Sequence, residues 1–107
     1  MSHPTIDILG EIAAERRRQV EIEGWKPELD DRHDNGEIAR AASAYALHAA
    51  LPDDIREAKA KYPDEEYRWP WHWDWWKPKN RRRDLIRAAA LIVAEIERLD
   101  RAAKAGA

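Results

Sequence analysis

The sequence predicts an all-α fold, because three segments have the apolar spacing of amphipathic helices and no segment shows the two-residue alternation of a strand. The chain has 107 residues, no cysteine and a formal net charge of -2. This length predicts one domain with a modest core, and no disulfide can stabilise it. We therefore expect residues 1–107 to form a single compact bundle of three main helices and one short helix, frayed at residues 1–5 and 104–107.

The first helix is expected at residues 6–23, with Gly24 as its stop. Its apolar stripe begins with Ile8, Leu9, Ile12 and Ala13. The same spacing then reaches Arg16, so a guanidinium lies on a face that began as core. We expect this guanidinium either to extend out of the core or to meet an anion there.

The second helix is expected at residues 36–50 and is rich in alanine, with Tyr45 among its few large side chains. Small side chains let neighbouring backbones approach closely, so we expect this helix to be covered on more than one side. A short helix is expected to begin after Pro52, in front of two aspartates that suit a positive helix end, and to run to Tyr62.

Residues 63–80 contain three prolines and five of the six tryptophans of the chain, so we expect an ordered, packed loop and no long helix. The last helix, at residues 81–103, has the strongest pattern in the sequence. Its stripe consists of Leu85, Ala89, Ile92, Val93, Ile96 and Leu99. We expect Leu85, Ile92 and Ile96 to form the core together with Tyr45.

Composition also limits the partners. The sequence pI near 6.1 argues against general binding of duplex DNA, which requires a large basic excess. No stretch approaches the ~18 apolar residues that cross a bilayer, and no signal-peptide pattern opens the sequence, so we expect a cytoplasmic protein without a membrane partner. The alanine-rich helix and the last helix offer more apolar surface than one short chain covers, so we expect a homo-oligomer, in the form of a dimer.

Aromatic rings and cations occur together in two runs, ERRRQVEIEGW at residues 15–25 and WPWHWDWWKPKNRRR at residues 69–83. Bases stack on indoles, and arginine side chains and helix N-termini bind phosphate oxygens, so this combination is typical of a nucleotide site. A histidine in the loop between the first two helices is a further nucleobase or phosphate partner. A satellite core of indoles beneath solvated arginines is the structural alternative. The candidate ligand-binding residues are Arg16, Trp25, His33, Trp75, Trp76, Lys77, Lys79 and Arg82.

Carboxylates on three helices indicate an alternative, a magnesium-dependent enzyme. Helical nucleoside triphosphate pyrophosphohydrolases of the MazG type hold magnesium with similar carboxylates, on two motifs with three-residue spacing. No helix of this chain carries a clean ExxE followed by ExxD, so the chain departs from that pattern. The metal ligands under this alternative would be Glu11, Glu15, Glu37 and Asp84.

Two long runs resemble a family of small uncharacterised proteins encoded by tailed phages and prophages. They are EIAAERRRQVEIEGWKPELDDRHDNGEIARAASAYA and WPWHWDWWKPKNRRRDLIRAAALIVAEIERLDR, within about residues 10–101. The resemblance implies expression in the cytoplasm of an infected or lysogenic bacterium. Small phage proteins there often act on nucleotides, DNA or host defence.

The leading hypothesis is a phage-encoded, non-enzymatic binder that sequesters an anionic nucleotide signal of host defence, such as a cyclic nucleotide or an ADP-ribose derivative. This sponge needs no cofactor and no catalytic residue, whereas the MazG-like alternative needs magnesium. A further alternative is a protein-interaction inhibitor of a host factor, because tryptophan and arginine dominate interface hot spots.

Overall fold

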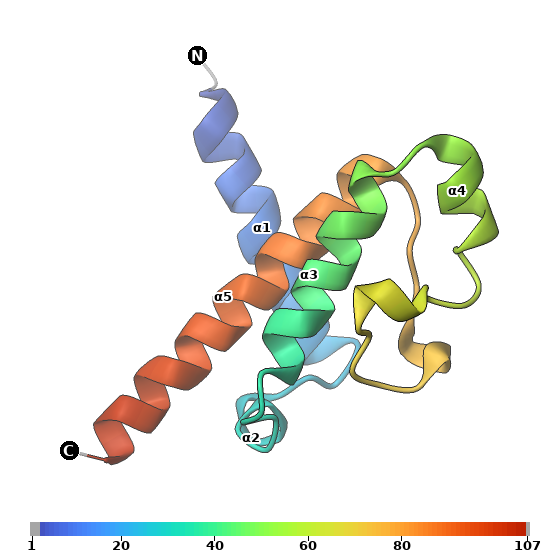
Figure 1. Cartoon of the computed structure of the whole chain (residues 1–107). Helices are drawn as coiled ribbons and strands as arrows, with labels where there is room; N and C mark the ends of the chain where they lie inside the picture. Colours follow the sequence, from blue (N-terminus) through green and yellow to red (C-terminus); the bar gives the residue numbers. More distant parts are fainter. Residues whose placement is uncertain (1–2, 107) are drawn as a thin grey trace.

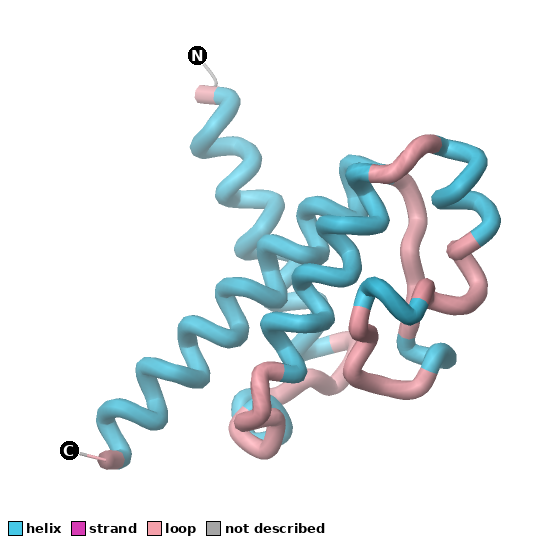
Figure 2. Tube along the Cα trace, in the orientation of Figure 1, coloured by secondary structure: helices cyan, strands magenta, loops and turns pink. Residues whose placement is uncertain are grey.

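The computed structural model describes residues 3–106, and within them it is all-α, as predicted. Figures 1 and 2 show helices joined by loops, with no strand in this part of the chain. None of the helices within residues 3–106 combines the length and the apolar character needed to cross a membrane. The long helices are α1 (Pro4–Glu21), α3 (Glu37–Ala50) and α5 (Arg81–Ala105), the short ones are α2 (Pro27–Asp30) and α4 (Asp53–Ala58), and the 3-10 turns are η1 (Glu65–Tyr67) and η2 (Trp73–Trp75).

Helix α5 is the common partner of the other two long helices. It packs along α3 on one side and is crossed by α1 on another (Figure 1). The connection between α4 and α5 lies beside α3, on the side away from α1 (Figures 1 and 2). The first turns of α1 and the last turns of α5 project beyond these contacts (Figure 1). The middle of the molecule is therefore a packed core, whereas two helix ends extend from it.

Small residues make the contact between α3 and α5. Ala41 and Ala44 on α3 and Ala90 and Leu91 on α5 have no exposed surface. Helices that meet through alanines can approach closely, so many main-chain atoms come into van der Waals contact. The prediction that the alanine-rich helix is covered on more than one side agrees with this arrangement, because α5 and the aromatic loop both pack against α3.

An aromatic cluster orders the loop before α5, as the sequence predicts. Trp76 stacks on Tyr45 of α3 at 4.8 Å between ring centroids, and Trp69 meets both rings edge-on. The Trp76 indole N–H donates to the Lys59 carbonyl at 2.9 Å, so the polar edge of the ring is also satisfied. These contacts take the place of a regular backbone ladder in a segment that three prolines exclude from a long helix.

His48 is buried in the same cluster. Its Nδ1 lies 2.9 Å from the Tyr67 hydroxyl, and its ring meets Trp76 edge-on. Burial, reinforced by the positive charge of Arg56, lowers the pKa of His48 below its ordinary value of 6.5, although Asp84 opposes this shift. Folding therefore favours the neutral imidazole.

The apolar stripe predicted as the core of the last helix faces outward, so that prediction is wrong. Leu85, Ile92 and Ile96 are 49%, 50% and 52% exposed. The buried face of α5 instead carries Ala88, Leu91 and Ala94, in one cluster with Tyr45. The alanines of α3 select this face, because small side chains allow a closer contact than a row of isoleucines. Of the large predicted core residues, Tyr45 alone is buried. On α1, most of the expected apolar stripe is likewise exposed: Ile8, Leu9 and Ala13.

Helix boundaries differ from expectation at several ends. Helix α1 starts at Pro4, with the His3 side chain accepting from the backbone of Ile6, and α5 continues to Ala105, so these end turns are helical. Helix α4 ends at Ala58 and does not reach Tyr62. The fraying expected at residues 1, 2 and 107 lies outside the described residues.

We expect Leu91→Ala to lower the free energy of unfolding by about 2–5 kcal/mol, because it leaves a cavity where α5 meets α3. Urea unfolding followed by circular dichroism measures this change. Leu47→Ala, at an exposed site on α3, is the matched control and should cost much less. Equal losses for the two variants would contradict this description of the core.

We expect His48→Asn to cost stability at pH 7 and this cost to shrink as the pH falls below 6.5. The unfolded wild-type chain takes up a proton at the imidazole near pH 6.5, whereas the folded chain resists it, so wild-type stability declines towards acid. The gap between the two proteins should narrow by up to about 1.4 kcal/mol per pH unit. Urea unfolding of both proteins from pH 7 to pH 5 measures the difference in their free energies of unfolding. A difference that does not change with pH would contradict a buried, neutral His48.

Candidate functional site

A largely apolar pocket of about 340 Å³ opens between the loop after α1 and the tryptophan-rich loop. This volume is at the lower end of the range typical of small-molecule sites. Three indoles form much of its wall, together with two imidazoles and two carboxylates. The lining residues, which we call the indole pocket, are Glu23, Trp25, Leu29, Asp30, His33, Trp71, His72 and Trp75.

The indoles of the pocket are held by one another and by the main chain. The backbone N–H of Trp25 donates to the Gln19 carbonyl at 2.9 Å, directly after Gly24 turns the chain with a φ of +78°. Trp71 meets Trp25 edge-on at 5.4 Å and lies 5.2 Å from His33. The third indole, Trp75, belongs to η2. Rings from three separate segments therefore converge on one cavity.

Asp30 is the buried acid of the indole pocket, with only 4% of its surface exposed. Arg16 Nη2 donates to its Oδ2 at 3.0 Å. Burial raises the pKa of the Asp30 carboxyl, and the adjacent Arg16 charge opposes that rise. Glu23 lies on the same wall and accepts from Arg18 at 3.0 Å through Oε1. Each carboxylate has a second oxygen that these arginine contacts do not use.

Of the two outcomes expected for the guanidinium in the apolar stripe of the first helix, the structure shows the second, because Arg16 meets an anion. It is buried and binds two carboxylates, Asp30 on α2 and Glu97 on α5, the latter at 2.9 Å from Nε. Its charge is therefore used inside the protein, where it connects three helices. Arg16 supports the pocket through Asp30 and does not line it.

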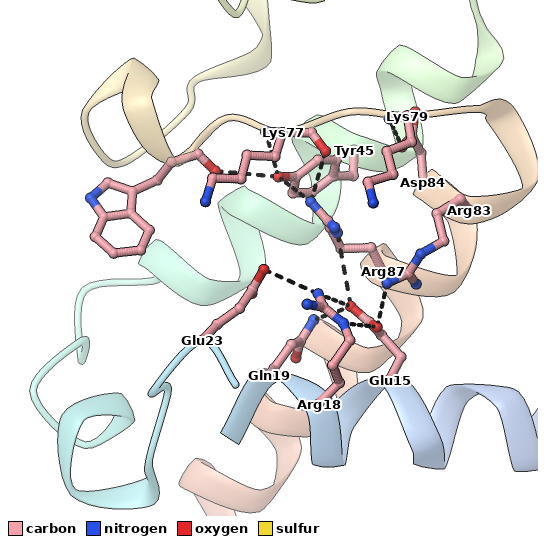
Figure 3. Close-up of polar contacts among 11 residues, drawn as sticks. Glu15, Arg18, Gln19, Glu23, Tyr45, Lys77, Lys79, Arg83, Asp84 and Arg87 are labelled. Atoms are coloured by element: carbon pink, nitrogen blue, oxygen red, sulfur yellow. Dashed lines mark hydrogen bonds and ion pairs between the residues drawn. The ribbon is translucent and has the colours of Figure 1, made fainter. Parts of the chain in front are cut away.

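A second buried charge cluster centres on Glu15 of α1, and Figure 3 shows arginines approaching it from α1 and α5. Arg18 and Arg83 donate to Glu15 at 2.8 and 2.6 Å, and Arg87 Nε lies 3.8 Å from Oε2. Burial alone would raise the pKa of Glu15, but the hydrogen bonds from Arg18 and Arg83 outweigh burial and hold the pKa below its ordinary 4.5. The carboxylate therefore stays ionised at neutral pH.

Arg87 links this cluster to the loop that carries the pocket rings. Its Nη1 donates to the Lys77 carbonyl at 2.7 Å and to the Tyr45 hydroxyl at 3.3 Å (Figure 3). The same hydroxyl accepts from the Lys77 N–H at 3.1 Å and lies 3.4 Å from the Trp75 carbonyl, to which it can donate. The charge cluster on α1 and the position of Trp75 are thus connected through two side chains.

The structure brings three of the residues predicted to bind ligand, Trp25, His33 and Trp75, around the indole pocket. The Lys77 ammonium lies 5.6 Å from the centre of the Trp75 ring. Trp76 is part of the core and is almost fully buried. The remaining cations lie away from the pocket wall: Arg16 behind Asp30, Arg82 in a bidentate pair with Glu11, and Lys79 at the start of α5.

Sequence reasoning missed the two carboxylates of the pocket wall and did not select Trp71 among the five clustered tryptophans. The available signal was the arginine in the apolar stripe of α1, because its buried charge required an acid. Periodicity alone could not identify that acid, which lies on the short helix α2 in a segment where the sequence predicts a loop. The pocket residues not predicted are Glu23, Leu29, Asp30, Trp71 and His72.

The carboxylates of the enzyme alternative do not form a metal site. Between residues 3 and 106, no three His, Asp or Glu side chains are grouped so that they could hold a metal ion. Each acid is bound by its own partner: Glu11 by Arg82, Glu15 by three arginines, Asp84 by Arg56, and Glu37 by His33. These residues therefore do not fit a magnesium cage of the MazG type.

Comparison of the chain with protein-family models, with curated proteins and with solved structures gives no match.

We expect Glu15→Gln to lower the free energy of unfolding by about 2–4 kcal/mol, because three arginines would lose their shared negative partner. Arg18 and Arg83 are partly exposed to solvent, so the expected loss of stability is at the lower end of the range for breaking a buried ion pair. Urea unfolding at neutral pH measures it. The control is Glu11→Gln, which breaks the exposed pair with Arg82 and should leave stability nearly unchanged. Equal effects would contradict the central role of Glu15.

Proposed function

We propose that this protein is a non-enzymatic binder of a nucleotide-type ligand, whose flat ring enters the indole pocket. The observation that carries the proposal is the pocket itself, in which Trp25, Trp71 and Trp75 surround a space of about 340 Å³. Stacking of a base on an aromatic side chain contributes ~1–3 kcal/mol and requires no particular sequence of bases. The resemblance to phage proteins supports a sponge for a host defence signal as the biological role.

The polar wall supports a base in preference to a plain hydrocarbon. Asp30 and Glu23 line the pocket together with the rings. Carboxylates accept hydrogen bonds from the amino groups of bases, as they do in recognition of cytosine N4. Because Arg16 and Arg18 hold these carboxylates in place, their orientation is set before a ligand arrives, which lowers the entropy cost of binding.

The same carboxylates repel an anion, so the phosphate of the ligand must lie at the mouth of the pocket. Lys77 provides a cation there, since its ammonium is 5.6 Å from the ring of Trp75 and the residue is exposed. In this arrangement the base is inside and the phosphate is outside. This arrangement differs from the one expected from the sequence, in which Arg16, Lys79 and Arg82 would also contact phosphate.

One observation favours a second candidate, the inhibitor of a host protein. Trp73 and Trp75, both on η2, are 50% and 48% exposed. Half-exposed indoles on one short turn are typical of interface hot spots. An interface of this kind would use both rings, whereas the indole pocket contains Trp75 and not Trp73.

We expect Trp75→Ala to weaken nucleotide binding by about 5- to 150-fold, the equivalent of ~1–3 kcal/mol of stacking. Trp73→Ala is the matched control, because it removes an equally exposed indole that belongs to the same turn and does not line the pocket. Titration calorimetry against cyclic dinucleotides, ADP-ribose and nucleoside triphosphates, with each ligand's nucleoside in parallel, measures the affinities. Lys77→Gln should weaken the binding of nucleotides but not the binding of nucleosides, which lack the phosphate.

The outcomes separate the candidates. Intact recovery of the nucleotide after incubation with magnesium supports a binder, and steady turnover assigns an enzyme. No heat from any nucleotide or nucleoside would overturn the proposal. Equal affinity losses for Trp73→Ala and Trp75→Ala would also overturn the pocket assignment.

A further inference from the structure

A row of apolar side chains on α5 has no partner within residues 3–106. Its large members, Leu85, Ile92, Ile96 and Leu99, are each about half exposed. With the alanines between and after them, they recur at alternating spacings of four and three residues over about 27 Å of helix. We call this row the α5 seam, and its residues are Leu85, Ala89, Ile92, Ile96, Leu99 and Ala103.

The spacing of the α5 seam specifies what can cover it. Alternation of four and three residues is the heptad pattern by which one helix packs side chains into holes on another. A strand or an irregular peptide would not match a row that repeats every 3.5 residues. The occupant is therefore a helix with a similar apolar row. Among residues 3–106, α1, α2 and α3 contact α5. Arg83 and Glu97, which bind α1, and Leu91, which packs against α3, are not seam residues.

We propose that the α5 seam is the dimer interface of this protein and that it pairs with the same seam of a second copy in antiparallel orientation. The seams of two copies have the same length and the same apolar chemistry, so each can cover the other. A two-fold symmetric interface requires this kind of self-complementary surface. The proposal concerns assembly and does not depend on what the indole pocket binds.

Surface area supports a second copy. The chain exposes 7153 Å², whereas a monomer of 12.5 kDa is expected to expose about 6,200 Å². The excess of about 1,000 Å² is close to the ~800 Å² that each partner buries in a standard interface. The Cα radius of gyration of 14.5 Å also exceeds the ~13 Å expected for this length.

Side-chain sizes favour the antiparallel orientation. The two-fold axis would cross the seam at the level of residue 94 along the helix. Leu85 then faces Ala103 of the second copy, and Ala89 faces its Leu99. Each of these layers then combines a large and a small residue, and the central layers pair Ile92 with Ile96. A parallel pair would instead place Ala89 against Ala89 and leave a void.

The shape of the molecule favours the same orientation. The last turns of α5 project beyond α3 (Figure 1). In an antiparallel pair these turns lie along the first turns of the other α5, so each copy covers seam residues that the other leaves exposed. Glu95, which flanks the seam, is bound by Arg98 at 2.6 and 3.1 Å, so its charge is compensated within the chain.

Sedimentation equilibrium tests the interface on the full chain. We expect a mass near 25 kDa, twice that of one chain. The double variant Ile92→Glu/Ile96→Glu should lower the mass to about 12.5 kDa. Leu47→Glu, which alters an exposed leucine of α3, is the control and should remain dimeric. A wild-type monomer at every concentration, or a double variant that stays dimeric, would overturn the proposal.

Cross-linking tests the orientation and does not depend on whether the double variant folds. The chain contains no cysteine, so each introduced thiol is the only one. In the antiparallel pair, an Ala89→Cys chain mixed with a Leu99→Cys chain should form a disulfide between them. Either variant alone should not, because equivalent positions lie about 15 Å apart along the helices. Cross-linking of Ala89→Cys with itself, or no cross-link in the mixture, would overturn the antiparallel pair.

Discussion

The stacking of Trp76 on Tyr45 is the contact on which the rest of the site depends. The loop at residues 63–80 lacks long helices and strands, so side chains must hold it in place. Trp76 anchors the loop in the core, and the Tyr45 hydroxyl contacts main-chain groups on either side of it. Without this anchor, the neighbouring tryptophans would have no defined position, and the indole pocket would lose most of its wall.

Buried charges hold α1 against the core, as the aromatic stacking holds the loop. Much of this helix exposes apolar residues, and its attachment to the core depends on Glu15 and Arg16, which bind partners on α2 and α5. Buried ion pairs contribute little net stability, but breaking one is costly and each has a strict geometry. Such pairs therefore determine where α1 crosses α5. They also orient Asp30, so the attachment of the helix and the polar wall of the pocket use the same guanidinium.

Helix α5 has three kinds of surface. Its alanines and Leu91 meet α3, and Arg83 and Glu97 bind residues of α1. The isoleucines and leucines of the seam remain at the surface. The most hydrophobic face of the helix is thus not its face towards the core, because the alanine-rich α3 packs closely against the alanines of α5 around Leu91. The proposed second copy would cover that face, and the chain would then bury its strongest apolar pattern between subunits.

Local chemistry in the sequence was enough to predict the three long helices and an ordered tryptophan loop, because periodicity and prolines can be recognised along the chain. The charge of Arg16 in an apolar stripe left two outcomes open, and an anion partner was one of them. Periodicity could not assign faces to partners, so the isoleucine stripe of α5 was misplaced in the core. It also could not reveal that Asp30, Trp71 and Trp75 share a wall. Those relations arise between residues distant in sequence, and only side-chain packing in three dimensions selects the face that is buried and the rings that meet.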